Sequence, residues 1–420
     1  MKEFYYKKGN LFAEEVKIKD VANHIKTPFY VYSKLAMERR FDQLKNSLGG
    51  LRHRIFYSVK ANSNVSVLKV FGSLGSGMDV VSLGEYDRSK AAGIAGKDIV
   101  FSGVGKTKSE IQSVIIGGIR QFNIESEPEL NLINQVATEM GKVIDVSIRV
   151  NPEVDAKTHR KITTGTKSDK FGVSFENVKM MFEKGIEMKG VSFVGLDMHI
   201  GSQISTLNAF RLSFSRLRKM TLELRRSGYA LSRLDVGGGI GIEHNLNGDS
   251  SIPIDSYSAL LKEYFDDLDC EIELEPGRSL VGNAGILVAS VIYPKLGDEN
   301  NFLIIDAAMN DFLRPALYDA RHQLLAVKKS SKKENGLFDI VGPVCESSDT
   351  FERSVNLPPM QSGDLVAFSS AGAYGAVMAS EYNTRPLIPE VLVSDSLYAI
   401  IRERPSISEI ILRDKIPEWL

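Results

Sequence analysis

The chain has 420 residues, of which 43% are hydrophobic and 25% are charged, and its formal net charge is −1. These proportions are typical of a soluble globular protein, and the length predicts two or three domains. A balanced charge excludes strong attraction to nucleic acids or membranes, and no apolar run is long enough to cross a bilayer. The two cysteines, Cys270 and Cys345, are too few for a disulfide framework, and the first residues lack the apolar core of a signal peptide. We therefore expect a cytoplasmic protein without nucleic-acid or membrane partners.

The N-terminal residues predict a short β-structured arm. Strand-like runs at Phe4–Lys7 and Leu11–Ala13 are joined by a turn that contains Gly9, and a third run covers Phe29–Tyr32. We expect residues 1–34 to join a β domain formed by the opposite end of the chain, with a larger domain inserted between.

From residue 55 to residue 278, strand-like runs alternate with helix-like segments such as Glu127–Met140, Phe210–Ser227 and Ile254–Leu268. Alternating β and α units predict a parallel sheet covered by helices, and eight units fit a (β/α)8 barrel over residues 35–280. An open doubly wound sheet is the alternative. The predicted strands are Ile55–Val59, Met78–Val81, Ile99–Ser102, Gln121–Ile124, Val146–Val150, Val194–Ile200, Leu231–Val236 and Glu271–Leu274.

Residues with potential catalytic or binding side chains cluster at the carboxyl ends of these strands. This clustering favours the barrel over the open sheet. A closed barrel brings all eight ends to one mouth, where active sites of such folds lie, whereas an open sheet would spread them apart. The residues are Lys60, Asn62, Asp79, Ser102, Glu125, Arg149, Asn151, His199, Ser202, Gly237–Gly239 and Glu275–Arg278.

After residue 278 the pattern changes to short β-branched or alternating runs separated by Gly, Pro and polar clusters. This is typical of an antiparallel β domain, which we place at residues 281–420. The polar stretches 241–251 and 328–336 are expected to be surface loops. The predicted strands are Gly285–Tyr293, Asn301–Ala307, Phe338–Val341, Leu365–Ser369 and Pro389–Val393.

Three features of the barrel segment together suit pyridoxal 5'-phosphate. Lys60 follows an apolar run, where burial would favour the neutral amine and therefore Schiff-base chemistry. An isolated lysine at the end of a strand, however, usually extends into solvent. The consecutive glycines Gly237–Gly239 follow the seventh strand, where the backbone of a barrel commonly binds phosphate, although three glycines alone also fit a simple turn. Glu275 can keep the ring nitrogen of the cofactor protonated.

Further residues extend this predicted site. His199 can stack on the cofactor ring or be an ordinary core histidine, and Ser202 can bind the phosphate. No spacing of His, Cys, Asp and Glu predicts a metal site. In the β domain, Arg314 and Tyr318 offer a guanidinium fork and a phenol that suit a carboxylate. Tyr374 lies among small residues that would let a planar group approach closely.

Seven blocks in this order resemble those of the diaminopimelate decarboxylases, within the fold-type III pyridoxal-phosphate decarboxylases that have an alanine racemase-like fold. The resemblance covers nearly the whole chain. Residues 159–162 differ most from the sequence that is usual in the family. The blocks are Tyr57–Asn62, His199–Ser202, Gly237–Gly239, Glu275–Arg278, Arg314–Tyr318, Gly342–Ser347 and Gly372–Gly375.

The resemblance implies a role for each residue. Lys60 forms the Schiff base, Glu275 pairs with the ring nitrogen, His199 packs on the ring, and Cys345 protonates the carbanion after CO2 leaves. Glu346 binds the ammonium group at the distal end of meso-diaminopimelate, and L-lysine is released as the last step of lysine biosynthesis. It also implies a homodimer in which the Cys345 loop completes the site of the other subunit. The remaining cofactor contacts are Asp79, Ser202, Gly237, Gly238, Gly239, Gly277, Arg278 and Tyr374, and the remaining substrate contacts are Arg278, Arg314, Tyr318 and Tyr374.

Three alternatives stay open at this point. A basic amino-acid or carboxynorspermidine decarboxylase would share most of the blocks, but Arg314 argues against the diamine-forming enzymes. An alanine-type racemase would be expected to place an arginine, and not Glu275, at the ring nitrogen. A non-catalytic carrier of pyridoxal phosphate would be a bare barrel without the β domain.

Overall fold

The computed structural model describes residues 3–154, 170–244, 251–329 and 336–420, and the chain divides into two compact units. The barrel unit comprises Glu38–Ile242 and Ser250–Leu280. The β unit comprises Met1–Met37, Glu243–Asp249 and Val281–Leu420. Residues 159–162, and the larger part of the two predicted loops at 241–251 and 328–336, lie outside the described residues.

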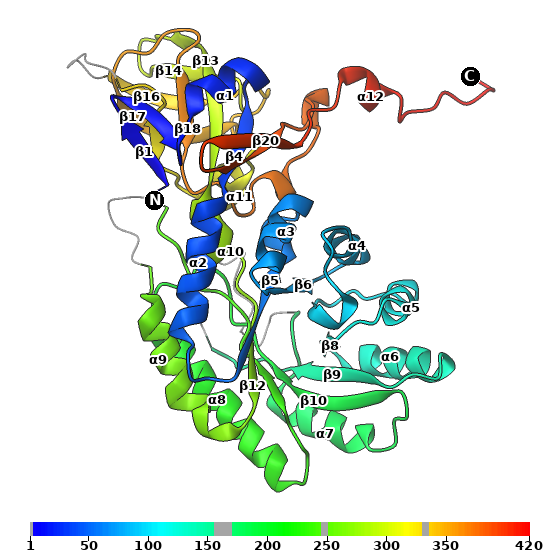
Figure 1. The fold of residues 1–420 in the computed structure, drawn as a ribbon. Coiled ribbons are helices and arrows are strands. Elements are labelled where there is room, and N and C mark those ends of the chain that lie inside the picture. The colour runs from blue at the N-terminus through cyan, green and yellow to red at the C-terminus, as the bar shows by residue number, and fades with distance from the viewer. Residues whose placement is uncertain (1–2, 155–169, 245–250, 330–335) are drawn as a thin grey trace. The chain divides into compact units, whose positions relative to one another are not determined.

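In the described chain, eight parallel strands close into a barrel in the order β10-β11-β12-β5-β6-β7-β8-β9 (Figure 1). Closure comes from β12 and β5, which pair in parallel with Ile272 opposite His53 and Leu274 opposite Ile55. The predicted (β/α)8 barrel is therefore confirmed, and the open sheet is excluded. The strands are β5 His53–Ser58, β6 Gly77–Val80, β7 Ile99–Phe101, β8 Gln121–Ile124, β9 Ile144–Arg149, β10 Val191–Asp197, β11 Arg233–Asp235 and β12 Glu271–Leu274.

Five of the barrel helices begin where the sequence supplies a side-chain cap. Ser126 accepts a hydrogen bond from the backbone of Glu129 and precedes Pro128, while Thr107 and Glu110 form a capping box. The three predicted helices are present and their ends differ by up to three residues. The helices are α2 Lys34–Ser47, α3 Val65–Ser73, α4 Leu83–Ala91, α5 Lys108–Ile116, α6 Glu127–Glu139, α7 Phe175–Gly185, α8 Leu207–Arg226, α9 Ile254–Phe265 and α10 Arg278–Val281.

Six of the eight predicted barrel strands run one to three residues past the observed strand ends, and two of these differences involve site residues. β5 ends at Ser58, so Lys60 lies in the 3-10 turn η1, Val59–Ala61. β10 ends at Asp197, so His199 lies in the following loop and not inside the sixth strand of the barrel. In each case the apolar run continues after the backbone has left the sheet, which is why hydrophobicity alone overestimates the strand.

The β unit holds a small antiparallel sheet, β1-β2-β3, and a nine-stranded sheet. The strands of the small sheet are β1 Phe4–Lys7, β2 Asn10–Ala13 and β3 Val16–Lys17, and helix α1 is Ile18–Ile25. The strands of the large sheet are β4 Phe29–Ser33, β13 Gly285–Lys295, β14 Phe302–Ile305, β15 Leu324–Ala326, β16 Gly336–Val341, β17 Thr350–Leu357, β18 Leu365–Phe368, β19 Glu390–Ser394 and β20 Leu397–Arg402. Two short helices complete the unit, α11 Arg314–Tyr318 and α12 Ile407–Ile411.

The large sheet is mostly, not wholly, antiparallel. β4 pairs antiparallel with β13 but parallel with β19, and β14 pairs parallel with β16, which corrects the prediction of a purely antiparallel domain. β4 is buried along its whole length and belongs to an apolar core that includes Phe29, Val31, Ile286 and Val391. In the parts of the chain that the structure describes, no helix combines the length and apolar character needed to span a bilayer.

Candidate active site

The amine of Lys60 lies beside a buried carboxylate at the mouth of the barrel. β5 and β6 pair with Ser58 opposite Asp79, and this register places Asp79 Oδ2 3.2 Å from Lys60 Nζ and 2.8 Å from Ser58 Oγ. Asp79 is fully buried, whereas Lys60 remains partly exposed. Apolar groups are therefore only part of the surroundings of this amine, because an anion is its immediate neighbour.

Glu275 is held by donors from two other strand ends. Its Oε1 accepts hydrogen bonds from Ser102 Oγ at 3.1 Å and from Asn123 Nδ2 at 3.2 Å. Burial, followed by the charges of Asp235 and Asp79, raises the pKa of Glu275 well above its usual range. The site therefore favours a positive or proton-bearing group next to this carboxylate.

Asp197 and Asp235 extend the acidic cluster, and the sequence analysis assigned neither of them a role. One oxygen of each lies within 4.8 Å of the others and of an oxygen of Glu275. Among the described residues, Asp79 Oδ1, Asp197 Oδ1 and Asp235 Oδ2 are buried without a hydrogen-bond partner. Burial raises the pKa of Asp197 to about 7 and that of Asp235 well above its usual range. An acidic residue at the carboxyl end of a barrel strand is the signal that could have identified them.

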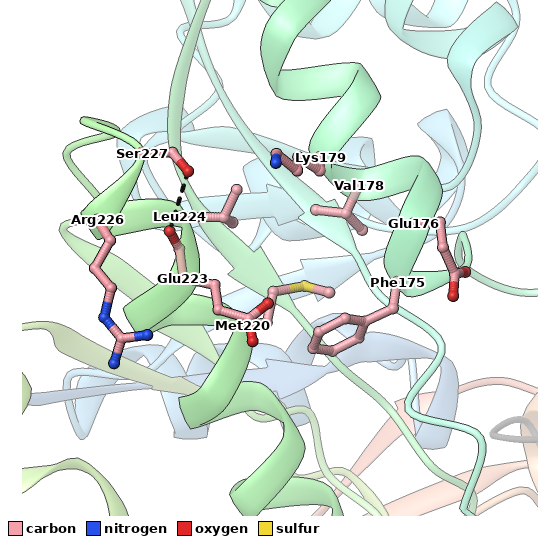
Figure 2. A pocket seen from close by; sticks show the side chains of 9 residues that line it. All are labelled: Phe175, Glu176, Val178, Lys179, Met220, Glu223, Leu224, Arg226 and Ser227. Carbon is pink, nitrogen blue, oxygen red and sulfur yellow. Dashed lines mark hydrogen bonds between the residues drawn. The ribbon is translucent and has the colours of Figure 1, made fainter.

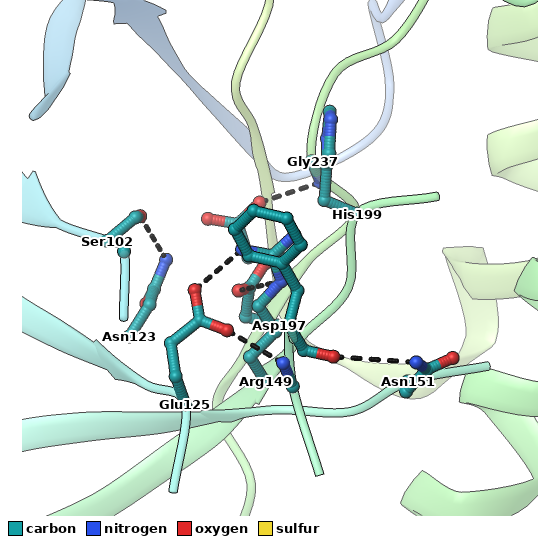
Figure 3. A network of polar contacts seen from close by, with 12 residues as sticks. Ser102, Asn123, Glu125, Arg149, Asn151, Asp197, His199 and Gly237 are labelled. Carbon is teal, nitrogen blue, oxygen red and sulfur yellow. Dashed lines mark hydrogen bonds and ion pairs between the residues drawn. The ribbon is translucent and has the colours of Figure 1, made fainter. Parts of the chain in front are cut away.

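Arg149 is the cation that faces this cluster from β9. Figure 3 shows its side chain beside Glu125 and Asp197, with Nη1 2.7 Å from Glu125 Oε1 and Nε 3.8 Å from Asp197 Oδ2. Glu125 also accepts a hydrogen bond from the backbone of Gly172 at 2.7 Å, and the Arg149 guanidinium lies 5.0 Å from the centre of the Phe171 ring. The carboxyl ends of β8 and β9 thus hold Glu125 and Arg149 together beside Asp197.

The backbone is packed so closely around Gly237–Gly239 that no side chain would fit there. A Cβ atom on Gly237, Gly238 or Gly239 would approach a backbone oxygen to 2.5, 2.3 or 2.4 Å, respectively. Gly237 and Gly239 also have positive φ values of 67° and 96°, which side-chain-bearing residues rarely adopt. Gly277 is similarly close to Ala61. These bare backbone segments form a cradle that suits a phosphate.

Ser202, Arg278 and His199 border the glycine cradle. Arg278 is buried, and its guanidinium donates to Ser202 Oγ at 3.0 Å. The backbone N–H of Gly238 donates to His199 Nδ1 at 3.2 Å, so the proton of the neutral ring is on Nε2. Burial, with the charges of Arg149 and Lys60, holds the pKa of His199 well below its usual range. His199 is therefore a neutral ring with a fixed orientation.

In the β unit, Arg314 is buried at the start of α11 and is held by a histidine. Its Nε donates to His322 Nε2 at 3.3 Å, and the other ring nitrogen of His322 lies 2.9 Å from the carbonyl oxygen of Ser369. The guanidinium lies 5.8 Å from the centre of the Tyr318 ring. The sequence analysis did not identify His322, because eight residues and the end of a short helix separate it from Arg314.

Cys345 and Glu346 are exposed on a loop that Asp349 anchors from inside. The buried carboxylate of Asp349 accepts hydrogen bonds from the backbone of Met309 and Val344, both at 2.7 Å. Glu346 accepts hydrogen bonds from Tyr382 and Ser348, which lower its pKa and favour the carboxylate. The loop thus presents a thiol and an anion to the surface.

Tyr374 has a positive φ of 54°, which is uncommon for a residue other than glycine. Residues in this conformation are found at ligand-binding sites as well as in turns. The structure thus brings together the predicted residues of the barrel unit at one mouth, and it places Arg314 with Tyr318 and Cys345 with Glu346 in the β unit.

The residues present fit pyridoxal 5'-phosphate. Unpartnered buried carboxylate oxygens suit a protonated ring nitrogen, and the glycine cradle with Ser202 and Arg278 suits the phosphate. Lys60 supplies the amine that the aldehyde requires. The three groups lie at the ends of strands that share one closed barrel.

A separate cavity of about 550 Å³ lies on the outside of the barrel, between α7 and α8 (Figure 2). Its apolar part is formed by residues such as Phe175, Val178 and Met220, and its polar part carries both signs of charge, including Glu176 and Lys179. It contains none of the predicted site residues.

Comparison with known proteins supports the same assignment over the whole chain. The family described as "Pyridoxal-dependent decarboxylase, pyridoxal binding domain" matches residues 35–282. The diaminopimelate decarboxylase of Haemophilus influenzae is 42% identical over 410 residues, which are 98% of each chain. The crystal structure of diaminopimelate decarboxylase from Helicobacter pylori complexed with L-lysine has a TM-score of 0.91 at 39% identity, covering 94% of this chain and 98% of that one.

The corresponding structure from M. jannaschii, also with L-lysine, has a TM-score of 0.94 at 34% identity and covers 99% of this chain and 98% of that one. These full-length matches to decarboxylases set aside the racemase and carrier alternatives. The chain belongs to the diaminopimelate decarboxylases, within the family of pyridoxal-dependent decarboxylases.

Proposed function

We propose that this chain converts meso-diaminopimelate to L-lysine and CO2 with pyridoxal 5'-phosphate, the last step of lysine biosynthesis. The observation that carries the proposal is the barrel mouth, where Lys60, the Glu275 cluster and the glycine cradle meet. The related structures whose titles name L-lysine as a bound ligand support the choice of product.

Each barrel residue has a physical task in this reaction. The bound cofactor supplies an electron sink for the carbanion that remains when CO2 leaves. Lys60 would hold the cofactor through its amine, whose position Asp79 fixes. Glu275, oriented by Ser102 and Asn123, keeps the ring nitrogen protonated. The neutral ring of His199 would border the cofactor without adding charge.

The phosphate and the substrate are bound by separate sets of groups. Ser202, Arg278, the backbone of Gly237–Gly239 and Gly277, and Tyr374 bind the phosphate, and Arg278 and Tyr374 also border the substrate. Arg314 and Tyr318 bind the distal carboxylate, and the carboxylate of Glu346 binds the distal ammonium group. Cys345 delivers the proton that replaces CO2. A ligand without the distal carboxylate would leave Arg314 buried without its anion, which is costly.

We further propose that the active unit is a homodimer with shared sites. Cys345 and Glu346 are exposed on the single chain, where a partner subunit can use them. We also infer that the enzyme works in the cytoplasm, where a reducing environment keeps Cys345 a thiol.

Mixing an inactive Lys60→Ala chain with an inactive Cys345→Ala chain is expected to restore activity. Every heterodimer would contain one intact site, so random exchange restores about a quarter of the wild-type sites. CO2 release measured after proven subunit exchange tests this expectation. A mixture that exchanges subunits and stays inactive would show that each site is built from one chain.

The reaction itself is tested by CO2 release from meso-diaminopimelate, L-ornithine, L-lysine and L-arginine, assayed side by side with bound cofactor. We expect release from diaminopimelate alone. Release from another substrate would leave the cofactor assignment intact but overturn the roles given to Arg314 and Glu346.

Replacing Asp197 with asparagine is expected to stabilise the cofactor-free protein above neutral pH. Because the pKa of Asp197 is raised to about 7 in the folded state, the folded state binds the proton more tightly than the unfolded state does. Folding therefore loses stability as the pH rises from about 4 to about 7, by on the order of 4 kcal/mol at most.

Thermal unfolding of the cofactor-free protein at about pH 5 and about pH 8 measures this difference. Asp298→Asn removes an exposed carboxylate and is the matched control. We expect a smaller loss of melting temperature at the higher pH in Asp197→Asn than in the wild type or the control. Equal losses in all three proteins would contradict the prediction.

A further inference from the structure

A buried ion pair to which the proposed reaction assigns no role lies beside the carboxyl ends of β7 and β8. The ammonium of Lys106, in the loop after β7, lies 2.5 Å from Glu129 Oε1 on α6. The two side chains are only 1% and 7% exposed. Apolar side chains of similar volume often stabilise a fold as well as such a pair does, so stability alone does not explain these charges.

The Lys106 ammonium uses all three of its protons, and two of them join strand ends. It donates to the carbonyl of Gly103 at 2.6 Å and to the carbonyl of Asn123 at 2.8 Å. Glu129 accepts the third hydrogen bond. The paired positions of β7 and β8 end one residue before Asn123. The ammonium thus takes the place of backbone pairing at the point where the two strands separate.

Glu129 extends the same set of contacts toward β9. Its Oε2 accepts a hydrogen bond from the backbone N–H of Glu125 at 2.8 Å, and Glu125 in turn pairs with Arg149. The backbone N–H of Glu129 donates to the capping residue Ser126, which fixes the carboxylate in the first turn of α6. Two side chains therefore connect the carboxyl ends of three neighbouring strands.

The two hydrogen-bond donors of Glu275, Ser102 and Asn123, directly adjoin these contacts. Ser102 precedes Gly103, whose carbonyl binds the ammonium, and Asn123 is bound through its own carbonyl. Asn123 Nδ2 also lies 3.1 Å from Ser102 Oγ, a bond that Figure 3 shows. A shift of either backbone segment would therefore move both donors relative to the carboxylate of Glu275.

We infer that Lys106 and Glu129 are positioning residues, which hold the two donors of Glu275 in place and so orient this carboxylate toward the ring nitrogen of the cofactor. The inference rests on the proposed function, because it assumes that Glu275 faces that nitrogen. Loss of the groups that orient a metal ligand costs roughly 10- to 100-fold in affinity or activity. This sets the scale expected for a carboxylate that is held in the same way.

A cofactor analogue without the ring nitrogen isolates this effect. The dissociation constants of pyridoxal 5'-phosphate and of its deaza analogue, in which carbon replaces that nitrogen, are measured by titrating the cofactor-free protein. The double variant Lys106→Met with Glu129→Met leaves no unpaired buried charge, which favours its folding. We expect the wild type to prefer pyridoxal phosphate over the analogue, and this preference to fall about tenfold in the double variant. A purely structural role would weaken the binding of both ligands equally and leave the preference unchanged.

Two single variants show which assumption fails if the preference does not change. Lys108→Met breaks the exposed ion pair of Lys108 with Glu139, close by in the sequence, and should leave the preference unchanged. Glu275→Gln should lower the preference at least as much as the double variant does. A preference that Glu275→Gln lowers and the double variant does not would overturn the inference alone. A wild type that binds both ligands equally, or a preference that neither change lowers, would overturn the inference together with the role of Glu275.

Glu129→Gln decides the case if unfolding temperatures show that the double variant does not fold. Glutamine keeps the volume of the side chain but has one acceptor oxygen, so one of the two hydrogen bonds of the carboxylate is lost. The preference should then fall about threefold, and an unchanged preference would overturn the inference. Release of CO2 from diaminopimelate by the wild type tests the proposed reaction separately from all of these titrations.

Discussion

Replacing Lys60 with alanine is expected to lower the rate of CO2 release from diaminopimelate by at least roughly 10⁴-fold. The variant loses the only amine that the described barrel mouth places next to Asp79, and with it the covalent attachment of the cofactor. The change should also abolish the visible absorbance that attached pyridoxal phosphate gives. Steady-state CO2 release and the absorption spectrum of the purified protein measure the two effects separately.

Lys60→Arg is the matched control, because it keeps a cation beside the buried carboxylate of Asp79. The arginine side chain does not form the Schiff base, so we expect it to be as inactive as alanine while its melting temperature stays closer to that of the wild type. Residual activity above about one hundredth of the wild type in either variant would contradict the nucleophilic role. A loss of activity with an unchanged cofactor spectrum would place the role of Lys60 after cofactor attachment.

The architecture of the barrel unit could be predicted because its signals are local and repeat along the chain. Each apolar run marks a strand, and closure of the barrel brings Lys60 and Glu275, 215 residues apart in sequence, onto the neighbouring strand ends β5 and β12. The acidic cluster could not be predicted in the same way. Asp197 and Asp235 lie within runs that were interpreted only as strands, and their proximity depends on how the strands pair.

The β unit shows the limit of reasoning from periodicity. β15, β17 and β20 were not predicted, since they are short or partly exposed and carry mixed polar residues. The hydrogen bond from Arg314 to His322 was missed for another reason. Sequence pattern identifies a guanidinium that can bind an anion, but only the fold shows which neutral side chain holds it.

Replacing Arg314 with alanine is expected to reduce kcat/KM for diaminopimelate by at least roughly 10³-fold while leaving cofactor affinity nearly unchanged. The buried guanidinium is the group of the β unit that we assign to the distal carboxylate, so its loss leaves that anion without its partner. Arg314→Lys keeps the charge without the planar fork, so its kcat/KM should lie between that of the wild type and that of Arg314→Ala. Rates are measured by CO2 release, and cofactor affinity by titration of the cofactor-free protein.

His322→Phe separates the positioning of Arg314 from its charge. Phenylalanine fills a similar volume next to Phe312, whose ring lies 4.6 Å from that of His322, but it cannot accept the hydrogen bond from Arg314 Nε. A guanidinium that is present but less well oriented should raise KM about tenfold with little change in kcat. If Arg314→Ala instead lost cofactor and substrate binding equally, the arginine would be structural, and the selectivity for diaminopimelate would have to come from Glu346 and Arg278.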